Sequence, residues 1–118
     1  MGKDIITPYG RITIVKDVIA KLSGIATTQC FGIIGMVSSR FSDGLSDLLG
    51  KEALSKGVDI FYKGNSLVIK VNVVVCYGTN ISMIARNIIE NVKYTIERHT
   101  GLTVSSVEVC VRGVRVLD

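Results

Sequence analysis

Tryptophan is absent from this 118-residue chain, and proline (Pro8) and histidine (His99) occur once each. Aromatic residues are limited to three phenylalanines and four tyrosines, while hydrophobic residues make up 47% of the chain. The core must therefore consist mainly of valine, isoleucine and leucine, which favours strands and aliphatic helix faces over an aromatic binding cage. A chain of this length should form one domain that buries about two-thirds of its unfolded surface.

Charge of one sign is not concentrated anywhere in the sequence. Fourteen Lys and Arg residues oppose ten Asp and Glu residues, and the formal net charge of +4 is spread along the whole length. Nucleic-acid binders concentrate basic residues on one patch, because their affinity comes from counterion release at adjacent phosphates. We therefore expect a mixed-charge surface and no nucleic-acid partner. The net positive charge and the mixture of helices and strands leave a small RNA-binding module as an alternative function.

The three cysteines, Cys30, Cys76 and Cys110, are far apart and form no CxxC pair. Such spacing is typical of reduced, buried thiols, and a zinc site would need its ligands in closer clusters. No apolar run approaches the about 20 residues needed to cross a bilayer, and no apolar leader begins the chain. We expect a cytoplasmic protein without metal or cofactor and without direct membrane insertion.

Signatures of catalysis are also missing. Neither a GxGxxG fingerprint nor a P-loop phosphate cradle occurs in the chain. His99 falls on the apolar side of a predicted helix, where we interpret it as a packed structural residue. General-base chemistry would need a nucleophile or a carboxylate placed beside it, and the sequence nominates none. The sequence therefore predicts that the protein is not an enzyme and has no catalytic, cofactor-binding or metal-binding residue.

Alternating apolar residues predict a hairpin formed by Val58–Tyr62 and Leu67–Cys76. One face of the second strand is wholly apolar and holds Leu67, Ile69, Val71, Val73 and Val75. The other face holds Val68, Lys70, Asn72, Val74 and Cys76. Because this second face is polar in its middle, we expect it to be only partly covered, either by solvent at an edge or by another surface.

A long amphipathic helix is predicted between Asn80, a suitable N-cap, and Gly101, which supplies a left-handed stop. Its apolar stripe consists of Ile81, Ile84, Ala85, Ile88, Ile89, Val92 and Ile96. Val104–Val111 then alternates as a final strand, with a bulge expected at Gly113. A strand, a helix and a strand in this order predict a right-handed parallel unit.

The N-terminal half predicts short strands at Arg11–Val15 and Phe31–Val37, with a helix over Val15–Cys30 between them. The expected fold class is therefore α+β: a mixed sheet of about five strands backed by two main helices. We expect a single domain at residues 9–118, preceded by a flexible N-terminal segment at residues 1–8.

Three surfaces are candidates for contact with another protein. The first is a ridge of small residues on the expected outer face of the first helix, formed by Ala20, Gly24 and Thr28. A glycine inside a helix costs about 0.5–1 kcal/mol relative to alanine, so Gly24 suggests close approach by the backbone of a second copy or a partner. The second is the outer face of the long helix, with Met83, Arg86, Asn87, Glu90 and Tyr94. The third is the polar loop Ser38–Lys56.

The order and spacing of several short motifs resemble a known family. These motifs are Tyr9–Ile14, Val18–Ala20, Cys30–Met36, Leu54–Val58, Val73–Ile81, Ala85–Asn87, Glu90–Val92, Thr100–Leu102 and Val111–Val114. Together they resemble the alkaline-shock, envelope-stress-response proteins of Gram-positive bacteria, within them the YloU-like branch. Two features depart from that pattern: Val15 replaces a common capping serine, and Gln29 and Phe31 replace acidic residues. If those acids contact a partner in the family, this chain lacks that contact.

The resemblance implies a non-catalytic scaffold or interaction protein in cell-envelope stress homeostasis. It also implies self-association, or docking on a small membrane-anchored protein that would hold this protein at the membrane periphery. YloU-like proteins are often encoded beside a dihydroxyacetone-kinase-like phosphotransferase. A second alternative is therefore an accessory subunit of a kinase-like protein in lipid metabolism.

Overall fold

The computed structural model describes residues 2–38 and 48–116. The elements are strand β1 (Gly2–Thr7), strand β2 (Gly10–Val15), helix α1 (Lys16–Thr28), strand β3 (Ile33–Met36), 3-10 helix η1 (Lys51–Gly57), strand β4 (Val58–Lys63), strand β5 (Ser66–Cys76), helix α2 (Ile81–Thr100) and strand β6 (Thr103–Arg115). Residues 39–47 of the predicted contact loop lie outside the described residues, and the end of that loop forms η1.

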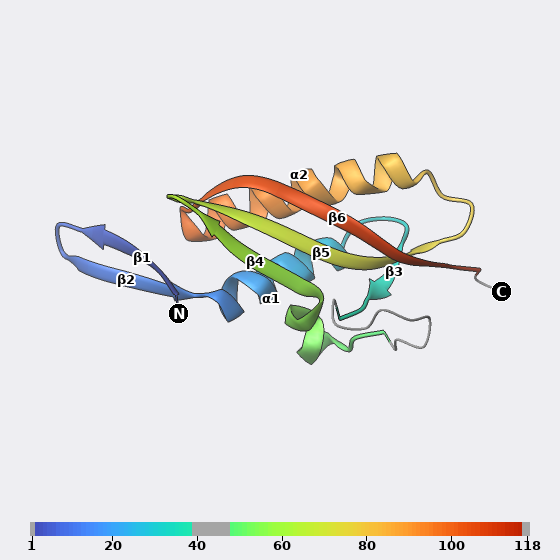
Figure 1. Cartoon of the computed structure of the whole chain (residues 1–118), viewed down its shortest axis with the longest axis horizontal. Coiled ribbons are helices and arrows are strands. Elements are labelled where there is room, and N and C mark those ends of the chain that lie inside the picture. The colour runs from blue at the N-terminus through green and yellow to red at the C-terminus, as the bar shows by residue number, and fades with distance from the viewer. Residues whose placement is uncertain (1, 39–47, 117–118) are drawn as a thin grey trace.

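Strand β5 is the central strand of the main sheet (Figure 1). Along one edge it pairs antiparallel with β4 through its first half and with β3 through its second half. Along the other edge it pairs with β6 in parallel, and the register shifts where Val111 and Gly113 face β5. The predicted hairpin, parallel pairing and bulge are thus confirmed. The α+β class is confirmed as well, with four strands in this sheet and two in a separate one.

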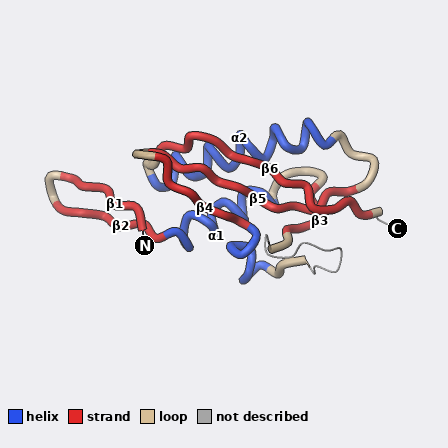
Figure 2. The backbone as a smooth tube through the Cα atoms, viewed as in Figure 1, coloured by secondary structure: helices blue, strands red, loops and turns tan. Residues whose placement is uncertain are grey.

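The N-terminal residues differ from expectation, because Gly2–Thr7 forms a strand instead of a flexible segment. It pairs antiparallel with β2 and places Ile5 opposite Ile12. This two-stranded ribbon extends away from the main sheet along the long axis of the molecule (Figure 2). Its residues Ile5 and Ile14 pack against the core. The ribbon accounts for much of the elongated outline, with extents of 55 × 25 × 22 Å.

Both main helices pack on the same face of the main sheet. The predicted apolar face of β5 is confirmed, since Leu67, Ile69, Val71, Val73 and Val75 are at most 1% exposed. These side chains share one core with Ile19 of α1 and with Ile88 of α2. The aliphatic composition therefore builds one helical layer over one sheet face, without a large aromatic residue at the centre.

The opposite sheet face is only partly covered, as the mixed polarity of β5 indicated. Val68, Lys70 and Cys76 are half-buried there, whereas Asn72 is fully buried. The Nδ2 of Asn72 donates to the Gly57 carbonyl oxygen at 3.0 Å, and its Oδ1 accepts from Arg112 Nε at 2.9 Å. A buried amide without hydrogen-bond partners would be costly. Both polar atoms of the Asn72 amide therefore have partners within the chain.

Helix α2 has the predicted caps. The Oδ1 of Asn80 accepts from the backbone N–H of Met83 at 3.1 Å, and Gly101 has φ of 75°. The buried stripe is narrower than predicted and consists of Ile84, Ile88, Val92 and Ile96. Ile81 and Ile89, which lie at its border, are exposed. Within the described part of the chain, no helix is long and apolar enough to span a bilayer.

Helix α1 buries two residues that the sequence placed on its outer face. Its buried residues are Ile19, Ala20, Ser23, Gly24, Ala26 and Thr27, whereas Val18 and Ile25 are 44% and 49% exposed. The placement of Ala20 and Gly24 on an outer ridge is therefore wrong. A Cβ on Gly24 would lie 2.9 Å from the Cβ of Leu54 in η1. The close approach that Gly24 suggested occurs, but it is made by the chain's own η1.

Candidate protein-interaction groove

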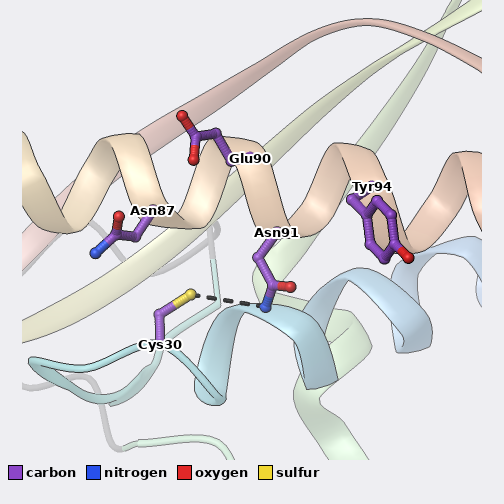
Figure 3. A pocket seen from close by; sticks show the side chains of 5 residues that line it. All are labelled: Cys30, Asn87, Glu90, Asn91 and Tyr94. Carbon is purple, nitrogen blue, oxygen red and sulfur yellow. Dashed lines mark hydrogen bonds between the residues drawn. The ribbon is translucent and has the colours of Figure 1, made fainter.

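Three of the predicted contact residues line one groove, where the end of α1 meets α2. Asn87, Glu90 and Tyr94 come from α2, and they are joined there by Asn91 and Cys30. The groove has a volume of about 360 Å³. Figure 3 shows Cys30 and Asn91 facing each other between the helices, with Asn87 and Tyr94 to either side and Glu90 directed away from α1. Glu90 therefore forms part of the rim.

The floor of the groove is fixed by Asn91. Its Nδ2 donates to the carbonyl oxygen of Ala26 at 2.7 Å and lies 3.8 Å from the Sγ of Cys30. The Cys30 thiol in turn lies 3.6 Å from the same Ala26 oxygen. Because carbonyl groups in the last turn of a helix lack intrahelical partners, these contacts complete the end of α1 and tie it to α2.

The Cys30 thiol is poorly suited to covalent chemistry. Burial raises the pKa of Cys30 above its ordinary value, and the hydrogen bond from Asn91 opposes that rise. A thiol is nucleophilic and metal-binding only as the thiolate, so raising the pKa keeps Cys30 in its unreactive form. Across residues 2–38 and 48–116, no three Cys, His, Asp or Glu side chains gather into a potential metal site.

The rim of the groove offers polar groups to the outside. Asn87 and Glu90 are exposed, and neither makes a side-chain hydrogen bond or ion pair to another described residue. Tyr94 is 59% exposed, its hydroxyl accepts from Arg98 Nη1, and the Arg98 guanidinium lies 5.6 Å from its ring centroid. An amide and an aromatic ring thus lie beside the C-terminal end of α1, which carries a partial negative charge, while the Glu90 carboxylate is directed away from α1 at the outer rim. This arrangement suits a donor-rich or cationic side chain.

The other predicted contact residues are not brought together. Met83 and Arg86 are exposed on α2 but do not line the groove, and Thr28 is exposed near the end of α1. Ala20 and Gly24 are buried. His99 is exposed at the end of α2, so the expectation of a packed structural histidine is wrong.

Sequence reasoning missed Cys30 and Asn91 as groove residues. The sequence predicts a first helix that continues to Cys30, whereas α1 ends at Thr28 and Cys30 lies just beyond that end. Asn91 is a polar residue that directly precedes the buried Val92. A polar side chain beside the apolar stripe was the available signal, because such a group needs a hydrogen-bond partner when it is drawn toward the core.

Comparisons with known proteins agree with the motif pattern. The model of the alkaline-shock protein family, described as having a cell envelope-related function, matches residues 4–116. The uncharacterized protein YloU of Bacillus subtilis is 43% identical over 119 residues, which cover 100% of this chain and 99% of YloU. The uncharacterized protein Spy1614 of Streptococcus pyogenes serotype M6 is 38% identical over 94% of this chain and 93% of its own. No solved structure matches.

Proposed function

This chain belongs to the alkaline-shock protein family, and we propose that it serves a cell envelope-related function as a non-catalytic interaction protein. In this proposal it docks a partner in the groove between α1 and α2, and it self-associates through a separate surface. The observation that carries the docking part is the exposed pair Asn87 and Glu90, which has no partner among the described residues and borders a groove with a fixed floor.

The chemistry of the groove supports binding over catalysis. Its one potential nucleophile is the Cys30 thiol, whose pKa is raised by burial. Among the described residues that line the groove, Glu90 is the single carboxylate, and it lies at the exposed rim without a second acidic or basic catalytic group beside it. General acid–base catalysis needs a titratable group held beside the reacting atoms and tuned toward neutral pH. An exposed carboxylate at the rim is not held in this way.

The groove also defines the chemistry of its partner. Its volume of about 360 Å³ is at the small end of the range for ligand sites and suits one or two side chains. Glu90 and the amide oxygen of Asn87 would accept hydrogen bonds from a lysine or arginine, while Tyr94 would contact its aliphatic stem. We therefore propose a basic segment of a membrane-anchored or metabolic protein as the occupant.

Affinity purification from native cells, read by mass spectrometry, tests the docking proposal. The baits are the unaltered chain, the variant Glu90→Lys and the matched control Glu52→Lys, which makes the same charge change at an exposed position outside the groove. A genuine partner should be recovered with the unaltered chain and with Glu52→Lys, and should fall about tenfold or more with Glu90→Lys. Equal recovery with all three baits would remove the groove from the proposal.

A further inference from the structure

Strand β6 borders the main sheet and leaves one of its edges without a partner strand. It has 13 residues, and β5 occupies one edge over nearly its whole length. Among residues 2–38 and 48–116, no strand pairs with the opposite edge. An unpaired edge presents a row of backbone N–H and C=O groups, which is a template for a strand of another chain.

The first residues of this edge already have a hydrogen-bond partner, whereas its middle residues are accessible. The backbone N–H of Val104 donates to Glu97 Oε2 at 2.9 Å, so a side chain of α2 already occupies that position. From Ser106 to Val111 the pairing with β5 continues without a register shift, so this stretch is regular strand. Ser106, Glu108 and Val111 are exposed along it. The accessible segment is therefore long enough for a strand of typical length to pair with it.

A row of charges runs across the sheet and stops at this edge. Asp59 of β4 lies opposite Lys70 of β5, and Lys70 lies opposite Glu108 of β6. The signs alternate across three strands, and opposite charges on neighbouring strands stabilise a sheet. Glu108 has no ion pair with another described residue. A fourth strand would continue the row if it placed a cation beside Glu108.

A second copy of β6 supplies that cation. In antiparallel pairing about a two-fold axis, the residue on the axis faces its own counterpart, and residues two before and two after it face each other. With Cys110 on the axis, Glu108 of each copy faces Arg112 of the other, which directly follows the regular stretch at the bulge. Arg112 points to the same sheet face as Asn72, to which its Nε donates, and this face also carries Glu108. An axis at Glu108 would instead oppose two like charges.

We propose that this protein dimerises by antiparallel pairing of β6 with β6 of a second copy, with Cys110 at the two-fold axis and two symmetric Glu108–Arg112 ion pairs. The main sheets of the two copies then form one continuous sheet. On the opposite face the same register places Val109 against Val111 of the second copy, so apolar contact accompanies the ion pairs. This inference rests on the self-association part of the proposed function and assigns its surface.

Charge reversal tests the edge. Sedimentation velocity across a series of concentrations should give a dimer for the unaltered chain and an at least tenfold weaker dimer for Glu108→Arg, because the new arginine faces Arg112. Glu108→Gln, which removes the attraction without adding repulsion, should weaken the dimer less. The double variant Glu108→Arg with Arg112→Glu should recover most of the loss. A dimer unaffected by Glu108→Arg overturns the edge assignment alone, whereas a strictly monomeric unaltered chain overturns self-association itself.

Cross-linking tests the register without any charge change. In a variant with Cys30→Ser and Cys76→Ser, Cys110 is the remaining thiol. Diamide accepts the two hydrogens as two thiols form one disulfide, and directly opposed residues in antiparallel strands have Cβ atoms about 4.5–5.5 Å apart, close to disulfide geometry. We expect a covalent dimer on a non-reducing gel, and none for a matched variant that retains only Cys76. A dimer that persists in sedimentation but does not cross-link through Cys110 overturns this register.

Discussion

At the residue scale, the missing side chain of Gly24 allows two segments of the chain to pack closely together. It lies in α1 against η1, where a Cβ would come within 2.9 Å of Leu54 Cβ. Its helix penalty of about 0.5–1 kcal/mol is therefore offset by packing inside the chain. The sequence indicated that something approaches Gly24, but it could not say whether the approaching backbone belonged to this chain or to another.

Substitution of Gly24 by alanine should lower the free energy of unfolding by about 1–3 kcal/mol, because the added methyl group overpacks the contact with Leu54. The matched control is Gly50→Ala, since a Cβ there meets nothing within 4 Å and the backbone φ is −74°. That control should change stability by no more than about 0.5 kcal/mol. Urea denaturation of both variants provides the measurement. Equal stabilities would contradict the tight contact.

A second prediction at the residue scale concerns the pKa of Cys30 and its hydrogen bond with Asn91. Burial favours the neutral thiol, so the pKa of Cys30 is raised, and the Asn91 hydrogen bond partly offsets that rise. Alkylation of Cys30 should therefore reach half its maximal rate at a higher pH in the folded chain than in urea. In Asn91→Leu the midpoint should move higher still, because the opposing hydrogen bond is lost. The measurement uses a Cys76→Ser, Cys110→Ser background, and a folded midpoint at or below the unfolded one would refute the prediction.

At the scale of elements, the two helices differ in how far they could be predicted. Helix α2 has a side-chain cap, a glycine stop and a clear apolar stripe, so its bounds and the centre of its buried face followed from sequence. Helix α1 begins after Val15, which makes no side-chain cap, and five of its six buried residues are Ala, Ser, Gly or Thr. Hydrophobic periodicity cannot find a face of small residues, because burial there depends on how closely η1 approaches.

The β1–β2 ribbon is the element least supported by the rest of the molecule. It rests on Ile5 and Ile14, on a Lys3 Nζ hydrogen bond to the Gly64 carbonyl oxygen at 3.2 Å, and on Lys3 lying over the Tyr62 ring, which Lys16 at the start of α1 also contacts. Isolated two-stranded ribbons are at best marginally stable in water. This dependence also explains why β1 was missed, since a short alternating segment alone does not specify a strand.

Amide hydrogen exchange should therefore separate the ribbon from the main sheet. Amides of β1 should exchange through local opening, at least about a hundredfold faster than the paired amides of β5, which require global unfolding. Tyr62→Ala should increase exchange in β1 further, because it removes the ring beneath Lys3 and Lys16. Matching protection in β1 and β5 would show that the ribbon opens only with the whole domain.

At the scale of the whole molecule, the groove and the β6 edge are two separate binding surfaces. The groove lies between α1 and α2, while the edge residues Glu108 and Arg112 belong to a strand that contributes nothing to the groove lining. The sequence pointed to Asn87, Glu90 and Tyr94 through their helical spacing. It gave no sign of the β6 edge, because whether a strand lies at a border depends on the pairing order of the complete sheet.

The two surfaces should consequently respond independently to mutation. Glu90→Lys should leave the dimer dissociation constant within about twofold of the unaltered chain, and Glu108→Arg should leave recovery of the groove partner unchanged, because distant sites without shared contacts act additively. Raised salt should weaken the dimer of the unaltered chain, since its ion pairs are exposed, and should weaken Glu108→Gln less. Sedimentation and partner pulldown on the same variants measure both. Loss of the dimer in Glu90→Lys would mean that the groove itself lies in the dimer interface, and the surfaces would then have to be treated as one.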